Sequence, residues 1–151
     1  MRLLTAIPGA VLWLLDANDP VKDNLRGEAG ARGVDPNRLV FAPRLPSPEH
    51  LARHRLADLF LDTLPYNAHT TASDALWAGL PVLTCAGDTF AGRVAGSLLR
   101  AAGLPELVAG SPAAYESMAL RLAREPALLA QASRQPAEFA ALRYCPLHAP
   151  L

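Results

Sequence analysis

The sequence predicts an α/β fold in which a parallel sheet carries helices on both faces. Two observations predict it. Short apolar runs alternate with longer stretches of helical pattern, as in chains built from strand–helix units. The chain has 151 residues, of which 51% are hydrophobic, enough to bury the core of one globular domain. We therefore expect residues 1–151 to form a single domain.

The N-terminal part of the chain is expected to contain three strands and two helices. The strands are expected at 11–15, 38–41 and 59–61, and the helices over about 21–32 and from residue 47 onward. Gly33 is expected to stop the first of these helices. Ser47 is expected to be the N-cap of the second, because Pro48 then occupies the first helical position, where its missing N–H costs no hydrogen bond.

The C-terminal part is expected to contain a fourth strand and four helices. The strand is expected at 81–84, and the helices at 71–78, 89–102, 111–125 and 126–142. Gly79 and Pro81 are expected to end the first of these helices. Residues 1–6 have the pattern of a helix end, and residues 143–151 break into proline-rich turns. We therefore expect the chain to be part of a larger protein, truncated at both ends.

Charge and cysteine content bear on the classes of partner. Lysine plus arginine and aspartate plus glutamate number 14 each, so no net field attracts a nucleic acid or an anionic membrane. Cys85 and Cys145 lack the spacing of a zinc site, and a cytoplasmic setting is the simplest expectation. No apolar stretch approaches the roughly 20 residues of a membrane span. We expect no metal, no nucleic acid and no membrane.

Polar side chains gather immediately before the helix expected at 71–78. His69, Thr70 and Thr71 stand at its start, and Asp74 lies within its first turn. This is the carboxyl edge of the expected sheet, where open α/β sheets bind ligands. The first turn of a helix has backbone N–H groups without partners and carries about half a positive charge, which suits a phosphate. Threonine hydroxyls, an imidazole and a carboxylate would add contacts to a nucleotide diphosphate.

The same residues also allow simpler interpretations. Thr71 and Asp74 have the spacing of a capping box, in which both side chains only satisfy the helix backbone. The chain has neither a GxGxxG nor a GxxxxGK[ST] motif. A second pair, His50 and Arg53, lies three residues apart on one helix face and would suit a base and a phosphate, or else forms a solvated surface turn.

Longer segments resemble a known family. Residues 57–84, ADLFLDTLPYNAHTTASDALWAGLPVLT, and 87–99, GDTFAGRVAGSLL, resemble the C-terminal half of the catalytic region of O-linked N-acetylglucosamine transferases, whose bacterial homologues carry tetratricopeptide repeats. The similarity continues through 8–16 and 38–62 and extends to about Leu129. It implies one Rossmann-like lobe of a two-lobed GT-B glycosyltransferase, with a uridine diphosphate sugar as donor and no required metal.

The resemblance implies a role for each polar residue. His69 would pack against uridine, and Thr70 and Thr71 would bind the diphosphate. Asp74 would take the ribose hydroxyls, and His50 and Arg53 would line the base and ribose end of the pocket. Ser47 departs from the family, because animal members have a lysine there, and Ala86-Gly87-Asp88-Thr89 stands where the family usually has Pro-Gly-Glu-Thr.

The implied function is the UDP-sugar-binding half of an inverting protein O-glycosyltransferase that moves N-acetylglucosamine to serine or threonine. No catalytic base is assigned, because it and the acceptor protein would belong to a missing N-terminal lobe. The isolated chain is expected to be inactive and to expose apolar surface that promotes self-association. Two alternatives stay open: a protein N-glucosyltransferase of the same fold that uses UDP-glucose, and a non-catalytic binding or scaffold module.

Overall fold

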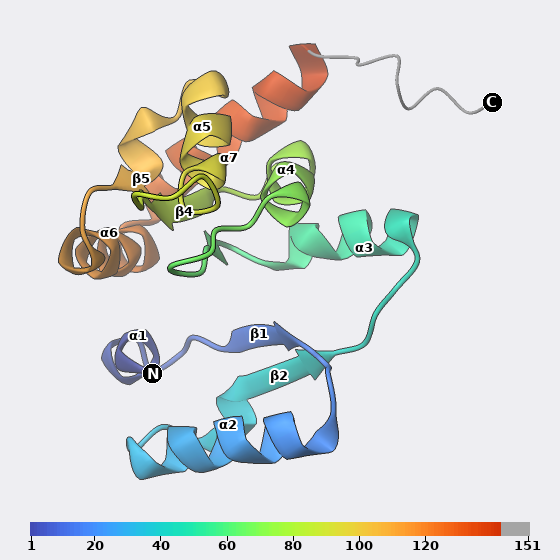
Figure 1. The fold of residues 1–151 in the computed structure, drawn as a ribbon, viewed down its shortest axis with the longest axis vertical. Coiled ribbons are helices and arrows are strands. Elements are labelled where there is room, and N and C mark those ends of the chain that lie inside the picture. The colour runs from blue at the N-terminus through green and yellow to red at the C-terminus, as the bar shows by residue number, and fades with distance from the viewer. Residues whose placement is uncertain (143–151) are drawn as a thin grey trace. The chain divides into compact units, whose positions relative to one another are not determined.

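The computed structural model describes residues 1–142, with side-chain surroundings for residues 1–134. Cys145 and the turns expected at 143–151 lie outside the described residues. The chain divides into two compact units, Met1–His50 and the part from Leu51 onward (Figure 1). Within the described residues, no helix is long and apolar enough to cross a bilayer.

The first unit is a strand–helix–strand motif preceded by a short helix. Its elements are α1 (Arg2–Ala6), β1 (Leu12–Leu15), α2 (Asp19–Ala31), the 3-10 helix η1 (Pro36–Arg38) and β2 (Leu39–Ala42). The two strands are parallel and pair Leu12 with Leu39. Their core contains Leu4 of α1 and Ala29 of α2, both buried against Leu39. Apolar residues from α1, β1, α2 and β2 therefore meet in one core beside the two-stranded sheet.

The ends of α2 follow from its capping residues. The Asn18 side chain accepts a hydrogen bond from the Val21 N–H at 3.0 Å, so the helix begins at Asp19, two residues before its expected start. At the other end Gly33 has φ 71°, and the Val34 N–H donates to the Ala29 carbonyl at 2.9 Å. Gly33 thus ends the helix as expected, because glycine adopts positive φ at little cost.

The helix α3 (Ser47–Arg53) spans the boundary between the two units and is followed by the 3-10 helix η2 (His54–Leu56). The His50 N–H donates to the Pro46 carbonyl at 2.9 Å, which closes the first helical turn. Ser47 is therefore the first helical residue, and its expected role as the N-cap is wrong by one position.

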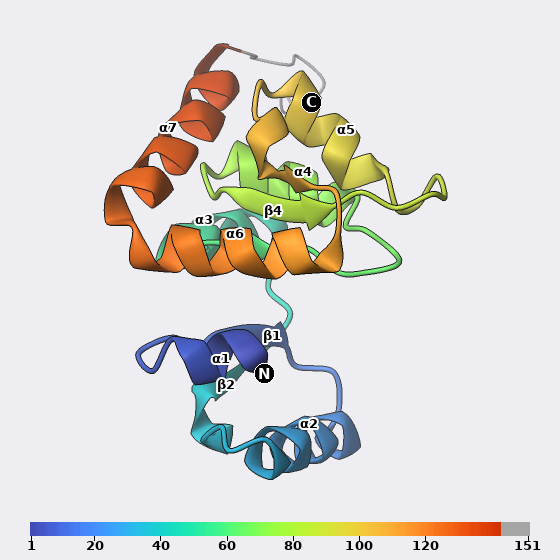
Figure 2. The same cartoon turned by 90° about the vertical axis from the view of Figure 1, so that its left-hand side faces the viewer.

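The second unit is a three-stranded parallel sheet with helices on both faces. Its strands β3 (Phe60–Leu61), β4 (Val82–Cys85) and β5 (Val108–Ala109) are ordered β3-β4-β5. Its longer helices are α4 (Thr70–Trp77), α5 (Val94–Ala101), α6 (Pro112–Arg124) and α7 (Pro126–Leu142). Figure 2 shows β4 between α5 and α6, and all four β4 residues are buried. The fold class expected from the sequence is confirmed.

Two features of this unit differ from the expected elements. The strand β5 and the preceding 3-10 helix η3 (Pro105–Leu107) were not expected, because two residues are too few to show a strand pattern. The helix α4 begins at Thr70 and ends at Trp77, one residue earlier at each end than expected. Gly79 follows it with φ 84°, and the Leu80 N–H donates to the Ala75 carbonyl at 2.9 Å, so the expected stop is confirmed.

Candidate functional site

The site begins where β3 ends, at Asp62. This side chain is only 5% exposed, and its two oxygens accept three hydrogen bonds. Oδ1 accepts from the N–H groups of Thr63 at 2.8 Å and Ala68 at 2.6 Å, and Oδ2 accepts from the Thr84 hydroxyl at 2.5 Å. Because Thr84 belongs to β4, one carboxylate connects the central strand to both ends of the 63–68 loop.

The 63–68 loop is closed further by its own polar groups. The Thr63 hydroxyl donates to the Tyr66 carbonyl at 2.7 Å, and the Asn67 amide donates to the Thr63 carbonyl at 3.0 Å. Asn67 is 1% exposed, and its Oδ1 has no hydrogen-bond partner among the described residues. The loop therefore has a defined shape without help from a ligand.

The loop leads directly into the N-terminus of α4. His69 is the N-cap residue, and its carbonyl accepts the first helical hydrogen bond, from the Ser73 N–H at 3.1 Å. No side chain caps this end. Among the described residues, the N–H groups of Thr70, Thr71 and Ala72 have no acceptor. The capping-box alternative for Thr71 and Asp74 is thus wrong, and the first-turn amides lack the side-chain acceptor that it would supply.

His69 contacts two aromatic rings. Its imidazole stacks on the Tyr66 ring with centroids 5.0 Å apart, and the Phe90 ring meets it edge-on at 6.2 Å. The His69 Nε2 atom is buried and has no hydrogen-bond partner in the described part of the chain. Tyr66 and Phe90 are themselves 64% and 82% exposed. The three rings form an aromatic cluster that is open to solvent on the Tyr66 and Phe90 side.

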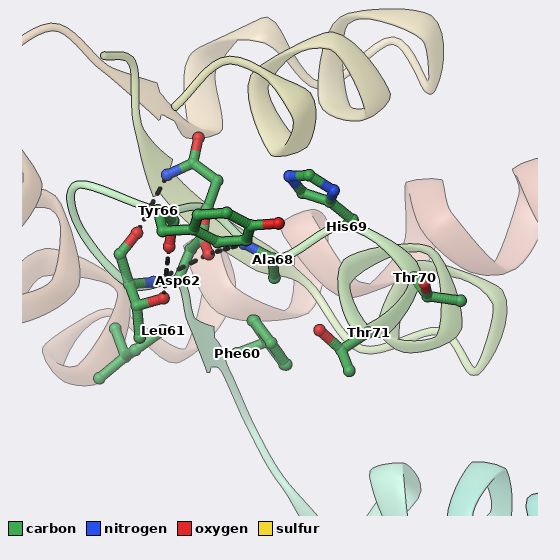
Figure 3. A pocket seen from close by; sticks show the side chains of 10 residues that line it. Phe60, Leu61, Asp62, Tyr66, Ala68, His69, Thr70 and Thr71 are labelled. Atoms are coloured by element: carbon green, nitrogen blue, oxygen red, sulfur yellow. Dashed lines mark hydrogen bonds between the residues drawn. The ribbon is translucent and has the colours of Figure 1, made fainter. Parts of the chain in front are cut away.

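An open depression of about 490 Å³ lies at this junction. It is lined by Phe60, Leu61, Asp62, Thr63, Tyr66, Asn67, Ala68, His69, Thr70 and Thr71. Figure 3 shows the Tyr66 and His69 rings on one side of this space, and Phe60 and Thr71 on another. The depression therefore combines aromatic surface with the unpaired amides of α4, a combination suited to a ligand with a ring and an anionic group.

The loop after β4 packs against the 63–68 loop. The Asn67 N–H donates to the Ala91 carbonyl at 3.0 Å, and the Gly87 N–H donates to the Gly92 carbonyl at 2.7 Å. The Arg93 side chain donates to the carbonyls of Gly87 and Asp88. These bonds hold residues 87–93 in a closed turn, so α5 begins at Val94 and the expected start at residue 89 is wrong.

The expected site residues fall into three groups. His69, Thr70 and Thr71 line the depression. Asp74 lies one turn further along α4, half-buried and outside the lining. His50 ends the first unit and Arg53 belongs to the second, both on α3, and Arg53 is not part of the lining. The assignment of these six residues to a ligand stays a prediction.

Three further residues shape the site and were not expected from the sequence. Asp62, Tyr66 and Asn67 all line the depression. A carboxylate directly after an apolar strand was a usable signal for Asp62, because such a residue lies at the ligand-binding edge of the sheet. Tyr66 and Asn67 gave no such signal, because their contacts depend on how the loop closes.

Tyr115 of α6 also contacts this strand end. Its hydroxyl donates to the Asp62 carbonyl at 2.9 Å. Burial, and to a lesser extent the negative charge of Asp62, raise the pKa of Tyr115 well above its ordinary value of 10.0. The hydroxyl therefore stays protonated, as a donor, throughout the neutral range.

Metal-ligating side chains do not gather here. Among the residues that the structure describes, no group of three or more His, Cys, Asp or Glu side chains has the arrangement needed to hold a metal ion. The donors around the depression are mainly backbone N–H groups, which bind anions.

Comparison with known proteins identifies the family of this chain. A family model described as glycosyl transferase family 41 matches residues 1–138. A solved structure of an O-GlcNAc transferase mutant from Thermobaculum terrenum superposes with a TM-score of 0.88 at 38% sequence identity, covering 93% of this chain and 28% of that one. The α/β lobe is thus shared with a glycosyltransferase of known structure.

Two curated relatives are similar over most of the chain. A UDP-N-acetylglucosamine--peptide N-acetylglucosaminyltransferase of Caenorhabditis elegans is 42% identical over 122 residues, 81% of this chain and 11% of that protein. A probable enzyme of the same description from Arabidopsis thaliana is 40% identical over 123 residues, 81% of this chain and 13% of that protein. The chain thus spans a small part of the relatives it matches, and it belongs to glycosyl transferase family 41.

Proposed function

We propose that this chain is the UDP-sugar-binding part of an inverting protein O-glycosyltransferase, with UDP-N-acetylglucosamine as donor and serine or threonine hydroxyls of proteins as acceptors. The names of the similar proteins from Caenorhabditis elegans and Thermobaculum terrenum support this donor and this class of acceptor. The single observation that carries the proposal is the uncapped N-terminus of α4, which opens onto a depression beside an aromatic cluster.

The diphosphate is assigned to the start of α4. Three consecutive N–H groups, those of Thr70, Thr71 and Ala72, lack acceptors in the described structure, and the hydroxyls of Thr70 and Thr71 add donors beside them. Phosphate oxygens accept such bonds, and the partial positive charge of the helix end complements their negative charge. Asn67, buried with an unpartnered oxygen in the same depression, is a second feature that points to a ligand.

The nucleoside is assigned to the residues around the diphosphate. The His69 ring, held by Tyr66, offers an aromatic surface for uracil. The carboxylate of Asp74 would accept hydrogen bonds from the ribose hydroxyls, and His50 and Arg53 would line the base and ribose end. These roles rest on the resemblance to the family.

The contribution of this chain to catalysis would be electrostatic. In sugar transfer with inversion, the acceptor oxygen forms a bond to the anomeric carbon while the bond to the diphosphate breaks, so negative charge grows on the leaving diphosphate. The α4 amides and the threonine hydroxyls would stabilise that charge without rearranging. No residue of this chain is assigned as the general base that removes the acceptor proton.

Calorimetric titration of the 151-residue chain with uridine diphosphate tests the proposal. The double variant Thr70→Ala/Asp74→Ala removes a diphosphate donor and the ribose acceptor together. Because a hydrogen bond to a charged group contributes about 1.5–3 kcal/mol, we expect its affinity to fall by about tenfold or more.

The matched control for this titration is Ser73→Ala. Ser73 lies on the same helix but is exposed and outside the depression, so this variant should bind as the wild type does. Wild-type affinity in the double variant would show that the site is wrongly placed. No binding by the wild-type chain would favour the non-catalytic module instead.

A further inference from the structure

We infer that Asp62 is a positioning residue for the nucleotide-binding turn: its buried carboxylate fixes the 63–68 loop, and with it His69 and the first-turn amides of α4, before any ligand arrives. The inference rests on the proposed function, because it concerns the same depression. Asp62 acts through other groups in this role, since both of its oxygens already accept hydrogen bonds from the chain itself.

The connection from Asp62 to the binding groups is short. Its Oδ1 accepts from the Ala68 N–H at 2.6 Å, and Ala68 is the residue directly before His69. The same oxygen accepts from the Thr63 N–H at 2.8 Å, so both ends of the loop are held by one atom. Because His69 is also the N-cap of α4, any movement of Ala68 would move the imidazole and tilt the unpaired amides behind it.

The carboxylate is anchored to the most buried part of the sheet. Its Oδ2 accepts from the hydroxyl of Thr84, which is fully buried in β4. From the other side, the Tyr115 hydroxyl holds the Asp62 carbonyl at 2.9 Å. Through Asp62, the loop is therefore anchored to β4 and α6, in addition to its hydrogen bond with the loop after β4.

The residue type fits this role. Three donors converge on this side chain, two at one terminal atom and one at the other, so both terminal atoms must be acceptors. A carboxylate meets this requirement because both of its oxygens accept hydrogen bonds. Burial of its charge is costly unless hydrogen bonds compensate, and hydrogen bonds to an ionised acceptor are roughly twice as strong as neutral ones. Asparagine in its place would keep the shape and one acceptor oxygen but lose the charge.

Three variants of the 151-residue chain separate positioning from general stability. Asp62→Ala removes all three bonds, Asp62→Asn retains the shape, and Thr84→Val removes only the anchor to β4. Uridine diphosphate affinity is measured at a temperature where each variant is folded, and the Ala68 amide resonance is recorded without ligand.

We expect graded effects from these variants. Asp62→Ala should weaken uridine diphosphate binding about tenfold or more, and Asp62→Asn only about threefold, because neutral hydrogen bonds replace charged ones. The Ala68 amide proton should move upfield in both. Thr84→Val should lower the melting temperature while changing the affinity less than Asp62→Ala does.

The outcomes distinguish this inference from the proposed function. If the wild-type chain binds uridine diphosphate and Asp62→Ala binds it within twofold of the wild type, the positioning role is wrong. If the wild-type chain does not bind at all, the proposed function fails, and the Ala68 resonance alone decides whether Asp62 holds the loop. If Asp62→Ala does not fold, an unshifted Ala68 resonance in Asp62→Asn overturns the inference.

Discussion

Tyr115 shows how one buried hydroxyl ties a helix to the end of a strand. It belongs to α6, yet its hydrogen bond reaches the carbonyl of Asp62, 53 residues earlier in the sequence. Burial raises the pKa of this hydroxyl, so the folded chain favours its protonated form. A group whose pKa is raised on folding stabilises the fold below its unfolded pKa and loses that contribution as the pH rises beyond it.

Removing this hydroxyl is therefore expected to have a pH-dependent effect. At neutral pH, Tyr115→Phe should lower the free energy of unfolding by about 0.5–1.5 kcal/mol, the contribution of one hydrogen bond. The difference between wild type and variant should shrink once the pH exceeds the ordinary tyrosine pKa of 10.0. Urea unfolding at pH values from about 7 to about 11, a range that spans the ordinary pKa of tyrosine, measures this difference in the free energy of unfolding. A difference that stays constant with pH would contradict this account.

At the scale of elements, a glycine inside α2 and one just after it differ in backbone conformation. Gly33 follows the helix with φ 71°, whereas Gly27 lies inside it, and an added Cβ would meet nothing within 4 Å at either position. Steric contact therefore does not distinguish them, and only backbone conformation does.

Alanine at these two positions should change the stability of the chain in opposite directions. Gly33→Ala should destabilise the chain by about 1–2 kcal/mol, because an L-residue with a Cβ is strained in the left-handed region. Gly27→Ala should stabilise it by about 0.5–1 kcal/mol, because alanine loses less backbone entropy in a helix. Thermal unfolding of both variants provides the comparison. A loss of stability in Gly27→Ala would show that the helix propensity of α2 does not limit the stability of this unit.

The elements that the sequence predicted well are those with local signals. The helix α7 has its expected bounds of Pro126–Leu142. The helix α6 begins one residue later than expected because Ser111 caps it, accepting from the Ala114 N–H at 3.2 Å, and it ends one residue earlier, at Arg124. The strand β5 and the closed turn before α5 were missed, because they depend on pairing with β4 and on the carbonyls that Arg93 reaches. Propensity within a short window contains no information about such partners.

The candidate site shows the same difference between residues with a local signal and residues whose contacts form only in the folded chain. A helix N-terminus after a strand predicted that His69, Thr70 and Thr71 would share one location, and they line one depression. The capping box was a wrong interpretation, because the chain turns into α4 at His69 rather than at Thr71. The role of Asp62 needed the folded loop, because its partner Ala68 is brought back to it only when the turn closes.

At the scale of the whole molecule, the chain matches only a small part of the length of the proteins it resembles. It covers 28% of the Thermobaculum terrenum chain and 11% of the Caenorhabditis elegans protein. Its described residues form two compact units, a division that no local sequence pattern indicated. Our proposal that the chain binds the nucleotide therefore does not extend to sugar transfer, for which no general base is assigned among its residues.

We accordingly expect the 151-residue chain to bind uridine diphosphate and to transfer no sugar. Incubation with radiolabelled UDP-N-acetylglucosamine and a serine-containing acceptor peptide, followed by counting of the peptide, measures transfer. The Caenorhabditis elegans relative serves as the positive control and the Thr70→Ala/Asp74→Ala variant as the background. Label above that background would mean that this chain alone supplies the acceptor site and the base.

The close packing at Gly92 limits which substitutions the loop after β4 can accept. A methyl group there would meet the Pro65 carbonyl oxygen at 3.1 Å, the Gly87 Cα at 3.2 Å and the Thr89 hydroxyl at 3.3 Å. Two of these three neighbours are main-chain atoms, which no rotamer change can move aside. A mutant library in the loop after β4 should therefore keep glycine at this position and randomise the segments on either side of it jointly.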